Sequence, residues 1–273
     1  MAGKRTGWRC LDTGASNGAT NMAIDEALVR CGQDSPVLRF YRWSPPAISL
    51  GFHQHLAEVD AARCLHDGVD VVRRPTGGRA VYHANELTYS VTIPKGHELY
   101  ALPPLEVYDL VSSAIVAGLR ILDPRLALQR VEEPVGSGDY SGEFECFATS
   151  APFEIQAESK KLAGSAQRRY KAGLLQHGSI MLTDEHLRLR DYLADQAPAH
   201  RKPATFLQNR TISLEALLGR TVSYREVAQC LVAGFQSFFE IHLQTSVLSH
   251  SERALSEKLI PKYTNAGGNH HEV

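Results

Sequence analysis

The feature that most constrains the fold is a series of extended segments separated by short polar turns. Phe153 to Ala157, Lys161 to Arg168 and Gly173 to Leu182 have the composition and patterning of strands. The polar turn Glu158-Ser159-Lys160 joins the first two. Strands that follow one another through so short a turn pair antiparallel. The sequence therefore predicts a largely antiparallel sheet in this part of the chain.

Helical segments and further strands flank this region. The strand-like segments upstream are Pro36–Ser44, Ala47–Gly51, Val69–Arg73 and a hairpin formed by Ala80–His83 and Leu87–Ile93. Helices are predicted over Asn21–Arg30, with Thr20 as N-cap and Gly32 as the stop, after Pro103-Pro104, and after the capping box Ser223-Tyr-Arg-Glu226. Helices and mostly antiparallel strands are mixed rather than strictly alternated, which predicts an α+β fold.

Composition and charge exclude several classes of protein. The chain has 273 residues and a formal net charge of −1, so no global field would hold it on nucleic acid or anionic lipid. It has no secretory signal at residues 1–10 and no apolar run of the roughly 18–20 residues that cross a bilayer. The five cysteines are scattered and include no C-x-x-C pair. We therefore expect a cytoplasmic protein with reduced thiols.

The segment Arg73–His83, RRPTGGRAVYH, carries the densest set of groups suited to a ligand. Its adjacent glycines lack Cβ atoms and let backbone amides approach a ligand closely. Its three arginines are able to neutralise a phosphate or a carboxylate. No G-x-x-x-x-G-K-[ST] motif occurs, so the segment is not a P-loop. An ordinary turn with a solvated basic rim accounts for the same residues equally well.

A second candidate is KLAGSAQ, Lys161–Gln167, within the predicted sheet. Gly164, Ser165 and Ala166 are too small to fill a core and are typical of a strand that a ligand or another backbone approaches. Lys161 at the head of this stretch could supply a point charge. From the residues alone, an exposed strand lysine is the favoured interpretation.

Two single residues complete the set of candidates. Cys146 lies in FECFATSAPF, where it is either a small buried hydrophobe or a nucleophile whose pKa a nearby cation lowers. His177 interrupts an apolar strand just before Gly178, as either a core histidine or a pocket-lining one. No metal site is predicted, because His53 and His55 lack a third ligand.

Five segments, in this order, resemble the lipoate–protein ligase and octanoyltransferase family. They are NMAIDEAL (Asn21–Leu28), RRPTGGRAVYH (Arg73–His83), ELTYSV (Glu86–Val91), KLAGSAQ (Lys161–Gln167) and LLQHGSI (Leu174–Ile180). The resemblance implies a core related to biotin ligases and class II aminoacyl-tRNA synthetases, with a mostly antiparallel sheet flanked by helices. We expect a single domain, 1–273, with the catalytic core at about 33–220 and a helical C-terminal part at about 221–263.

Within this family, the sequence is more similar to the cysteine-dependent octanoyltransferases than to the ATP-dependent ligases. Ligases usually carry three consecutive glycines in the first motif, whereas Arg79 takes the third position here. The resemblance implies that Cys146 is the nucleophile and that Lys161 lowers its pKa. It also implies a substrate-binding set, which comprises Arg74, Gly77, Gly78, Arg79, Ala80, Val81, Tyr82 and His83 on one side and Gly164, Ser165, Ala166, His177 and Gly178 on the other.

The implied reaction moves octanoyl from the phosphopantetheine thioester of acyl carrier protein, through Cys146, to a lysine of a lipoyl-carrying protein. That acceptor would be the glycine cleavage H protein or the lipoyl domain of a 2-oxoacid dehydrogenase E2. A thioester donor needs no ATP, so no cofactor is expected, and neither nucleic acid nor membrane is an expected partner. Two alternatives stay open: a lipoate–protein ligase that uses ATP and Mg²⁺, and a non-catalytic relative that binds acyl groups or proteins.

Overall fold

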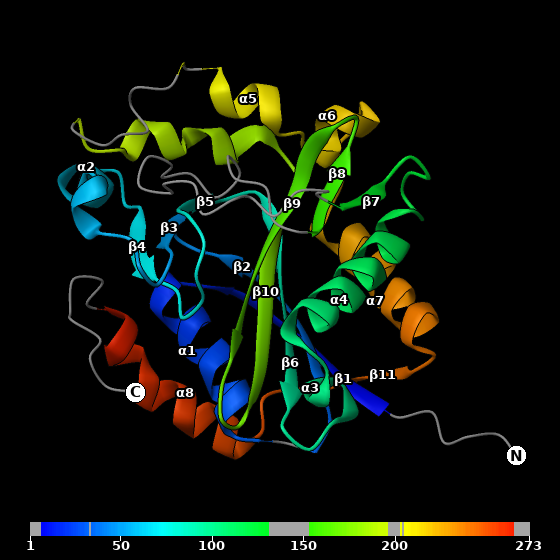
Figure 1. Ribbon diagram of the computed structural model, residues 1–273. Coiled ribbons are helices and arrows are strands. Elements are labelled where there is room, and N and C mark those ends of the chain that lie inside the picture. Colours follow the sequence, from blue (N-terminus) through cyan, green and yellow to red (C-terminus); the bar gives the residue numbers. More distant parts are fainter. Residues whose placement is uncertain (1–6, 33, 131–152, 196–202, 204, 265–273) are drawn as a thin grey trace, which may run out of the picture.

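The computed structural model describes residues 7–32, 34–130, 153–195, 203 and 205–264. Its main feature is an eight-stranded sheet packed between helices, with a separate three-stranded sheet beside it (Figure 1). From one edge to the other the large sheet contains β11 (His242–Thr245), β1 (Gly7–Ser16), β2 (Val37–Trp43), β6 (Glu86–Pro94), β10 (Gly173–Met181), β9 (Lys160–Arg169), β8 (Phe153–Ala157) and β7 (Ala127–Arg130).

The antiparallel character predicted from the sequence is confirmed. Every neighbouring pair from β2 to β7 runs antiparallel, and only β1 is parallel to its neighbours, β2 and β11. The turn between β8 and β9 has positive φ at Glu158 (52°) and Ser159 (61°), as two-residue hairpins of type I′ require. β11 was not indicated by the sequence, because only Leu243 of its four residues is buried and so no alternation is visible.

The smaller sheet corrects one prediction. It has the order β4 (Asp70–Arg73), β3 (Ala47–Leu50) and β5 (Val81–His83), with Ala47 opposite His83 in the antiparallel β3–β5 pair. The predicted hairpin between β5 and β6 is therefore wrong. Both edges of β6 are already occupied, by β2 and by β10, so β5 pairs elsewhere. The chain thus passes from one sheet to the other at residues 84–85.

Helices cover both faces of the large sheet. In Figure 1, α1 (Gly18–Arg30) and α8 (His250–Thr264) lie on one side, and α4 (Pro104–Leu119) and α7 (Tyr224–Phe239) on the other. The short helical segments are η1 (Leu56–Glu58), α2 (Ala61–His66), α3 (Glu98–Ala101), η4 (Asp184–Tyr192), α5 (Phe206–Arg210) and α6 (Leu214–Leu218). Within the described ranges, no helix is both long and apolar enough to cross a membrane.

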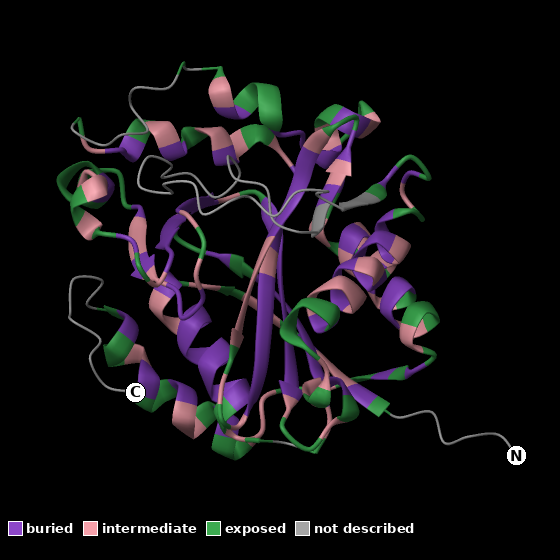
Figure 2. Ribbon diagram, viewed as in Figure 1, coloured by how far each residue is buried: buried purple, intermediate pink, exposed green. Residues whose placement is uncertain are grey.

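The helix starts follow the capping residues, with one shift. Ser223 caps α7 by accepting a hydrogen bond from the Glu226 amide, as predicted. α1 begins earlier than predicted, because Asn17 is its N-cap and accepts a 2.8 Å hydrogen bond from the Thr20 amide. α1 is buried along nearly its whole length (Figure 2), since the sheet covers one side of it and α8 packs on another. Polar residues of α1 are consequently enclosed in the core, and they prove central to the site.

Candidate active site

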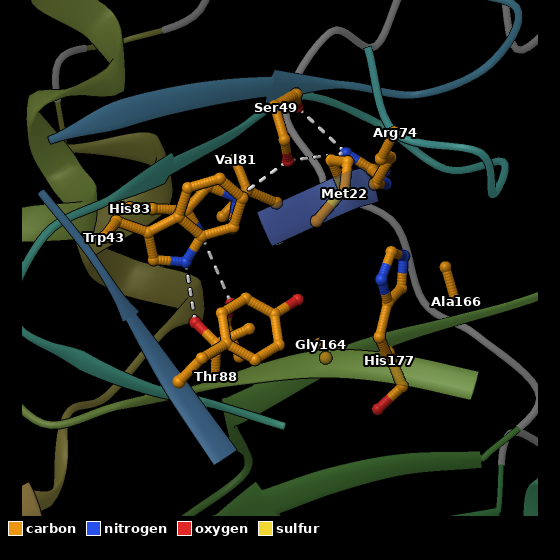
Figure 3. Close-up of a pocket in the computed structure, with 14 residues that line it drawn as sticks. Met22, Trp43, Ser49, Arg74, Val81, His83, Thr88, Gly164, Ala166 and His177 are labelled. Carbon is orange, nitrogen blue, oxygen red and sulfur yellow. Dashed lines mark hydrogen bonds between the residues drawn. The ribbon is translucent and has the colours of Figure 1, made fainter. Parts of the chain in front are cut away.

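Residues from both sheets and from α1 line a pocket with a free volume of about 30 Å³, which opens at one end to the surrounding solvent. Figure 3 shows Trp43, His83 and Thr88 gathered on one side of it, and Arg74, Ala166 and His177 on the other. The lining residues are Met22, Tyr41, Trp43, Ser49, Arg74, Val81, His83, Thr88, Gly164, Ser165, Ala166, His177, Gly178 and Ser179.

The structure brings most of the predicted binding residues together. The predicted residues in the lining are Arg74, Val81, His83, Gly164, Ser165, Ala166, His177 and Gly178. Tyr82 does not line the pocket, because successive side chains of β5 point to opposite faces; it stacks on Tyr192, with ring centroids 5.6 Å apart. Ala80 packs in the same apolar cluster. Gly77, Gly78 and Arg79 form the loop beside the pocket without lining it.

Of the two predicted catalytic residues, the structure describes Lys161 but not Cys146. Lys161 is buried in β9, three positions before the pocket residue Gly164. The carbonyl of Lys161 accepts a hydrogen bond from the Ile212 amide, which ties this end of β9 to the segment before α6. Cys146 lies outside the described residues.

Arg74 holds the glycine loop in shape. Its guanidinium donates hydrogen bonds to the carbonyls of Ser49, Gly77 and Arg79 and to the Ser49 hydroxyl, at 2.7–3.2 Å. These contacts use every N–H of the guanidinium. The loop also packs closely on Gly51, the residue that follows β3, because a Cβ at Gly51 would lie 1.9 Å from the Gly78 carbonyl oxygen. Arg74 therefore acts as a brace for the loop rather than as the solvated basic rim that the sequence left open.

Small residues allow β9 and β10 to form a thin wall on one side of the pocket. A Cβ at Gly178 would lie 2.4 Å from the Gly164 carbonyl oxygen and 2.9 Å from Cε1 of Tyr89. Tyr89 fixes this wall from β6, with its hydroxyl 2.6 Å from Ser165 Oγ. No side chain larger than hydrogen fits at position 178 without displacing a strand. The predicted close approach at Gly164–Ala166 is therefore an approach of backbone, with the pocket beside it.

His83 links the apolar side of the pocket to a buried carboxylate. Its Nδ1 lies 2.7 Å from Glu86 Oε1, and its Nε2 lies 2.7 Å from Ser49 Oγ. Its ring stacks on Trp43, with centroids 4.1 Å apart and planes inclined by 12°. Thr88 connects the same groups, because it accepts from Trp43 Nε1 and donates to Glu86.

His177 forms a second chain of the same kind. Its Nδ1 lies 3.0 Å from Asp25 Oδ2, and its Nε2 lies 2.7 Å from Thr76 Oγ1. Asp25 is fully buried in α1 and accepts three further hydrogen bonds, from Arg39 Nη1 (2.7 Å), Ser90 Oγ (2.7 Å) and the Tyr41 hydroxyl (3.0 Å). The carboxylate therefore has partners from β2, β6 and β10.

Burial and charge act in opposite directions on this pair. Desolvation alone would raise the pKa of Asp25, but the Arg39 charge and the hydrogen bonds from His177 and Ser90 outweigh it and lower that pKa. Desolvation is the largest influence on His177 and lowers its pKa below 6.5 despite the contact with Asp25. The pair is thus an ionised carboxylate beside a neutral imidazole at neutral pH.

Part of this site was not predicted from the sequence. The unpredicted lining residues are Met22, Tyr41, Trp43, Ser49, Thr88 and Ser179. No role was predicted for Asp25 or Arg39 either. A signal was present: Asn21 and Asp25 are one helical turn apart on a helix whose other residues are mostly apolar, and Arg39 interrupts an apolar strand. Buried polar residues in such positions require partners.

The cysteines that the structure describes are not activated. Burial raises the pKa of Cys10 and Cys64 to about 11, and it also raises the pKa of Cys31 and Cys230. These four side chains are thiols at neutral pH. In the described part of the chain, no cluster of three or more His, Cys, Asp or Glu residues could hold a metal ion.

The chain matches the family model of the lipoyl protein ligase A/B catalytic domain over residues 17–236, a span that includes the whole pocket. The chain belongs to this family. Among curated relatives, the Octanoyltransferase LipM of Symbiobacterium thermophilum is 40% identical over 262 residues, which cover 93% of this chain and 94% of the relative. The Octanoyltransferase LipM of Bacillus subtilis is 34% identical over 252 residues, which cover 90% and 91%.

Solved structures of the family share the fold. A bi-partite lipoate protein ligase from Thermoplasma acidophilum, described with its E2 lipoyl domain, superposes with a TM-score of 0.78 at 25% identity and covers 98% of this chain and 99% of its own. A lipoate-protein ligase A bound with ATP gives a TM-score of 0.73 at 26% identity, with 93% and 94% covered. The fold implied by the sequence motifs is therefore confirmed: a mostly antiparallel sheet flanked by helices, as in lipoate–protein ligases.

Proposed function

We propose that this chain transfers octanoyl from acyl carrier protein, through a thioester on Cys146, to a lysine of a lipoyl-carrying protein. It is an acyltransferase of lipoate biosynthesis, in keeping with the octanoyltransferases that it matches over most of its length. The acceptor is a small lipoyl-carrying protein, either the glycine cleavage H protein or the lipoyl domain of a 2-oxoacid dehydrogenase E2. The protein acts in the cytoplasm.

The pocket is the observation that carries this proposal. Met22, Tyr41, Trp43 and Val81 give it apolar surface, and polar groups reach it from both sides, from His83 and Thr88 on one and from Arg74 and His177 on the other. This combination suits an acyl chain that ends in a reactive carbonyl. At ~0.8 kcal/mol per buried methylene, enclosing an octanoyl chain contributes about 5 kcal/mol to binding.

The nucleophile in this proposal is Cys146, and Lys161 supplies the positive charge that favours its thiolate. The raised pKa values of Cys10 and Cys64 support this assignment, because those thiols are unsuited to attack at neutral pH. Thiolate attack on the donor thioester exchanges one C–S bond for another, so it needs no ATP. The later transfer to an amine converts a thioester into an amide and is downhill.

The alternative is an ATP-dependent ligase, which needs donors for the phosphate of an acyl-adenylate. In this structure the guanidinium N–H groups of Arg74 already donate hydrogen bonds to oxygens of Ser49 in β3 and of Gly77 and Arg79 in the loop. Arg79 stands where the ligase motif has its third glycine, and a side chain at this position would crowd the approach of a phosphate to the backbone. Both features favour the ATP-independent route.

Turnover with purified octanoyl-acyl carrier protein and a lipoyl domain, without ATP, tests the proposal. The wild-type protein should octanoylate the domain, and Cys146→Ala should abolish transfer. Cys64→Ala is the matched control, since Cys64 lies in α2, outside the pocket, and should keep its activity. Near-normal turnover by Cys146→Ala, or formation of octanoyl-AMP from free octanoate and ATP, would overturn the proposal.

A further inference from the structure

The basic run Arg168-Arg169-Tyr170-Lys171 lies outside the lining of the pocket. It is placed where β9 turns into β10, at one end of the large sheet (Figure 1). Lys95, which follows β6, is held beside this turn, because its amide donates a 2.9 Å hydrogen bond to the Ala172 carbonyl. The ends of three neighbouring strands thus bring four cations together, and we call them the tip surface: Arg168, Arg169, Lys171 and Lys95.

Uncharged groups hold the two arginines of the tip surface in place. Arg168 donates a 2.8 Å hydrogen bond to the Pro75 carbonyl, and Arg169 donates to the carbonyls of Tyr100 and Leu102. A carbonyl oxygen orients a guanidinium without cancelling its charge. Because these side chains are already ordered, they lose little conformational entropy when a partner binds.

The positive charge of the tip surface is not balanced by neighbouring carboxylates. Three of its side chains are exposed, and the fourth, Arg168, is partly exposed. None of them takes part in the ion pairs between described residues. Glu26, in the adjacent helix α1, is buried and already bound by Arg30 and Lys262. Glu98 of α3 is the exposed carboxylate nearest in sequence, and it leaves an excess of cations.

An unbalanced basic surface favours an acidic partner. Complementary charge typically raises association rates about 10–10³-fold, and the gain falls steeply with ionic strength. The chain as a whole has a net charge of −1, so this attraction is local to the tip surface. The proposed reaction has two protein partners, the donor carrier and the acceptor, and either one could be the acidic protein.

The distance from the tip surface to the pocket distinguishes the donor from the acceptor. Ala166 lines the pocket, and Arg169 lies further along β9 toward the turn. At roughly 3.3 Å per residue, these two residues are about 10 Å apart, and the turn lies beyond Arg169. An acceptor lysine has only a four-carbon stem, so its protein must sit against the pocket itself. The donor acyl group is carried on a phosphopantetheine arm, which is much longer than a lysine side chain.

We propose that the tip surface docks an acidic face of the donor acyl carrier protein, from which the phosphopantetheine arm extends along β9 to the pocket. This inference rests on the proposed octanoyl transfer and specifies where its donor binds. The tip surface makes and breaks no covalent bond. Its contribution is to the encounter with the donor, and it therefore acts on the KM for that donor and not on kcat.

Charge reversal at the exposed lysines tests this role. Lys171→Glu and Lys95→Glu should each raise the KM for octanoyl-acyl carrier protein about tenfold at low ionic strength, with kcat unchanged. The difference from wild type should shrink as salt is added, because exposed charges are screened. The KM for the lipoyl domain should not change. The KM for octanoyl-pantetheine, a donor that lacks the carrier protein, should not change either.

Arg225→Glu is the matched control, because it makes the same change of charge at an exposed cation away from the turn between β9 and β10. Arg225 lies in the first turn of α7, next to Tyr224, whose hydroxyl donates a hydrogen bond to Asp12 of β1. This variant should match wild type with both donors. An equal rise in KM for octanoyl-acyl carrier protein in Arg225→Glu would show that the effect is not specific to the tip surface, and would overturn the proposal.

Three results with the lysine variants would also overturn it. An equal rise in the KM for octanoyl-pantetheine would mean that the substitutions act on the pocket. A rise in the KM for the lipoyl domain alone would assign the tip surface to the acceptor. Unchanged KM values for every substrate would leave the tip surface without a docking role.

Binding of holo-acyl carrier protein, measured by fluorescence anisotropy at low ionic strength, tests the tip surface without turnover. Lys171→Glu should bind about tenfold more weakly than wild type, and Arg225→Glu should bind equally well. Equal affinity of wild type and Lys171→Glu would refute the docking surface even where transfer is observed. A wild type that binds the carrier through the tip surface but transfers no octanoyl would refute the proposed function and leave the docking surface in place.

Discussion

Replacing Arg39 by methionine should destabilise the protein strongly, because it leaves the Asp25 carboxylate without its opposite charge. Both side chains are fully buried, and Arg39 Nη1 lies 2.7 Å from Asp25 Oδ1. Arg39 also donates to Asn21 Oδ1 and to Thr13 Oγ1. Breaking a buried ion pair from one side costs roughly 3–5 kcal/mol. For a chain of this size, each kcal/mol lowers the melting temperature by roughly 2–4 °C, so we expect a fall of about 6–20 °C.

Urea unfolding at several pH values measures this effect and its cause. In the wild type the pKa of Asp25 is lowered, so its stabilisation is present above the unfolded pKa of about 3.9 and is lost as the pH falls through the folded pKa. In Arg39→Met, desolvation is no longer offset by Arg39 and raises the pKa of Asp25. The difference in unfolding free energy between wild type and variant should therefore be largest near pH 7 and shrink toward pH 4.

The double variant Arg39→Met/Asp25→Asn should recover part of the lost stability, because it removes the unpaired charge. Arg220→Met is the control: Arg220 forms an exposed ion pair with Glu226, and its loss should not change the midpoint measurably. A loss below about 1 kcal/mol in Arg39→Met, or a loss that does not vary with pH, would refute this reasoning.

Further predictions concern the nucleophile and the pocket wall. Lys161→Ala should shift the pH midpoint of Cys146 alkylation by iodoacetamide toward the free-thiol value of about 8.5, whereas identical profiles would show that another group activates the cysteine. Gly178→Ala should cost about 1–3 kcal/mol of stability by overpacking and reduce acyl transfer, because its Cβ would meet the Gly164 carbonyl at 2.4 Å. Gly96→Ala, whose Cβ meets nothing within 4 Å, should change neither property.

Local patterns were sufficient to predict individual elements. The strands β8, β9 and β10 and the helix α4 follow from alternation, turn residues and 3–4-residue spacing, all of which act between near neighbours. Alternation also separates His83 from Tyr82 on β5, but it does not choose the partner strand. The pairing of β5 with β3 depends on both edges of β6 being occupied, which is a property of the assembled sheet.

The loops and small residues of the candidate site were predicted from the sequence, but its buried polar residues were not. Asp25 and His177 are 152 positions apart, and no spacing rule relates them. Their contact arises because α1 is enclosed between the sheet and α8, which turns Asp25 toward β2, β6 and β10. The buried Asp25 carboxylate is tolerated there because the Arg39 guanidinium faces it.

The most direct test of the account is the intact mass of the wild-type protein after incubation with octanoyl-acyl carrier protein in the absence of ATP. We predict an increase by one octanoyl group, mapped by peptide analysis to Cys146, removed by hydroxylamine and discharged by added lipoyl domain. An unmodified mass, with octanoyl appearing on the lipoyl domain only when free octanoate and ATP are supplied, would contradict the account.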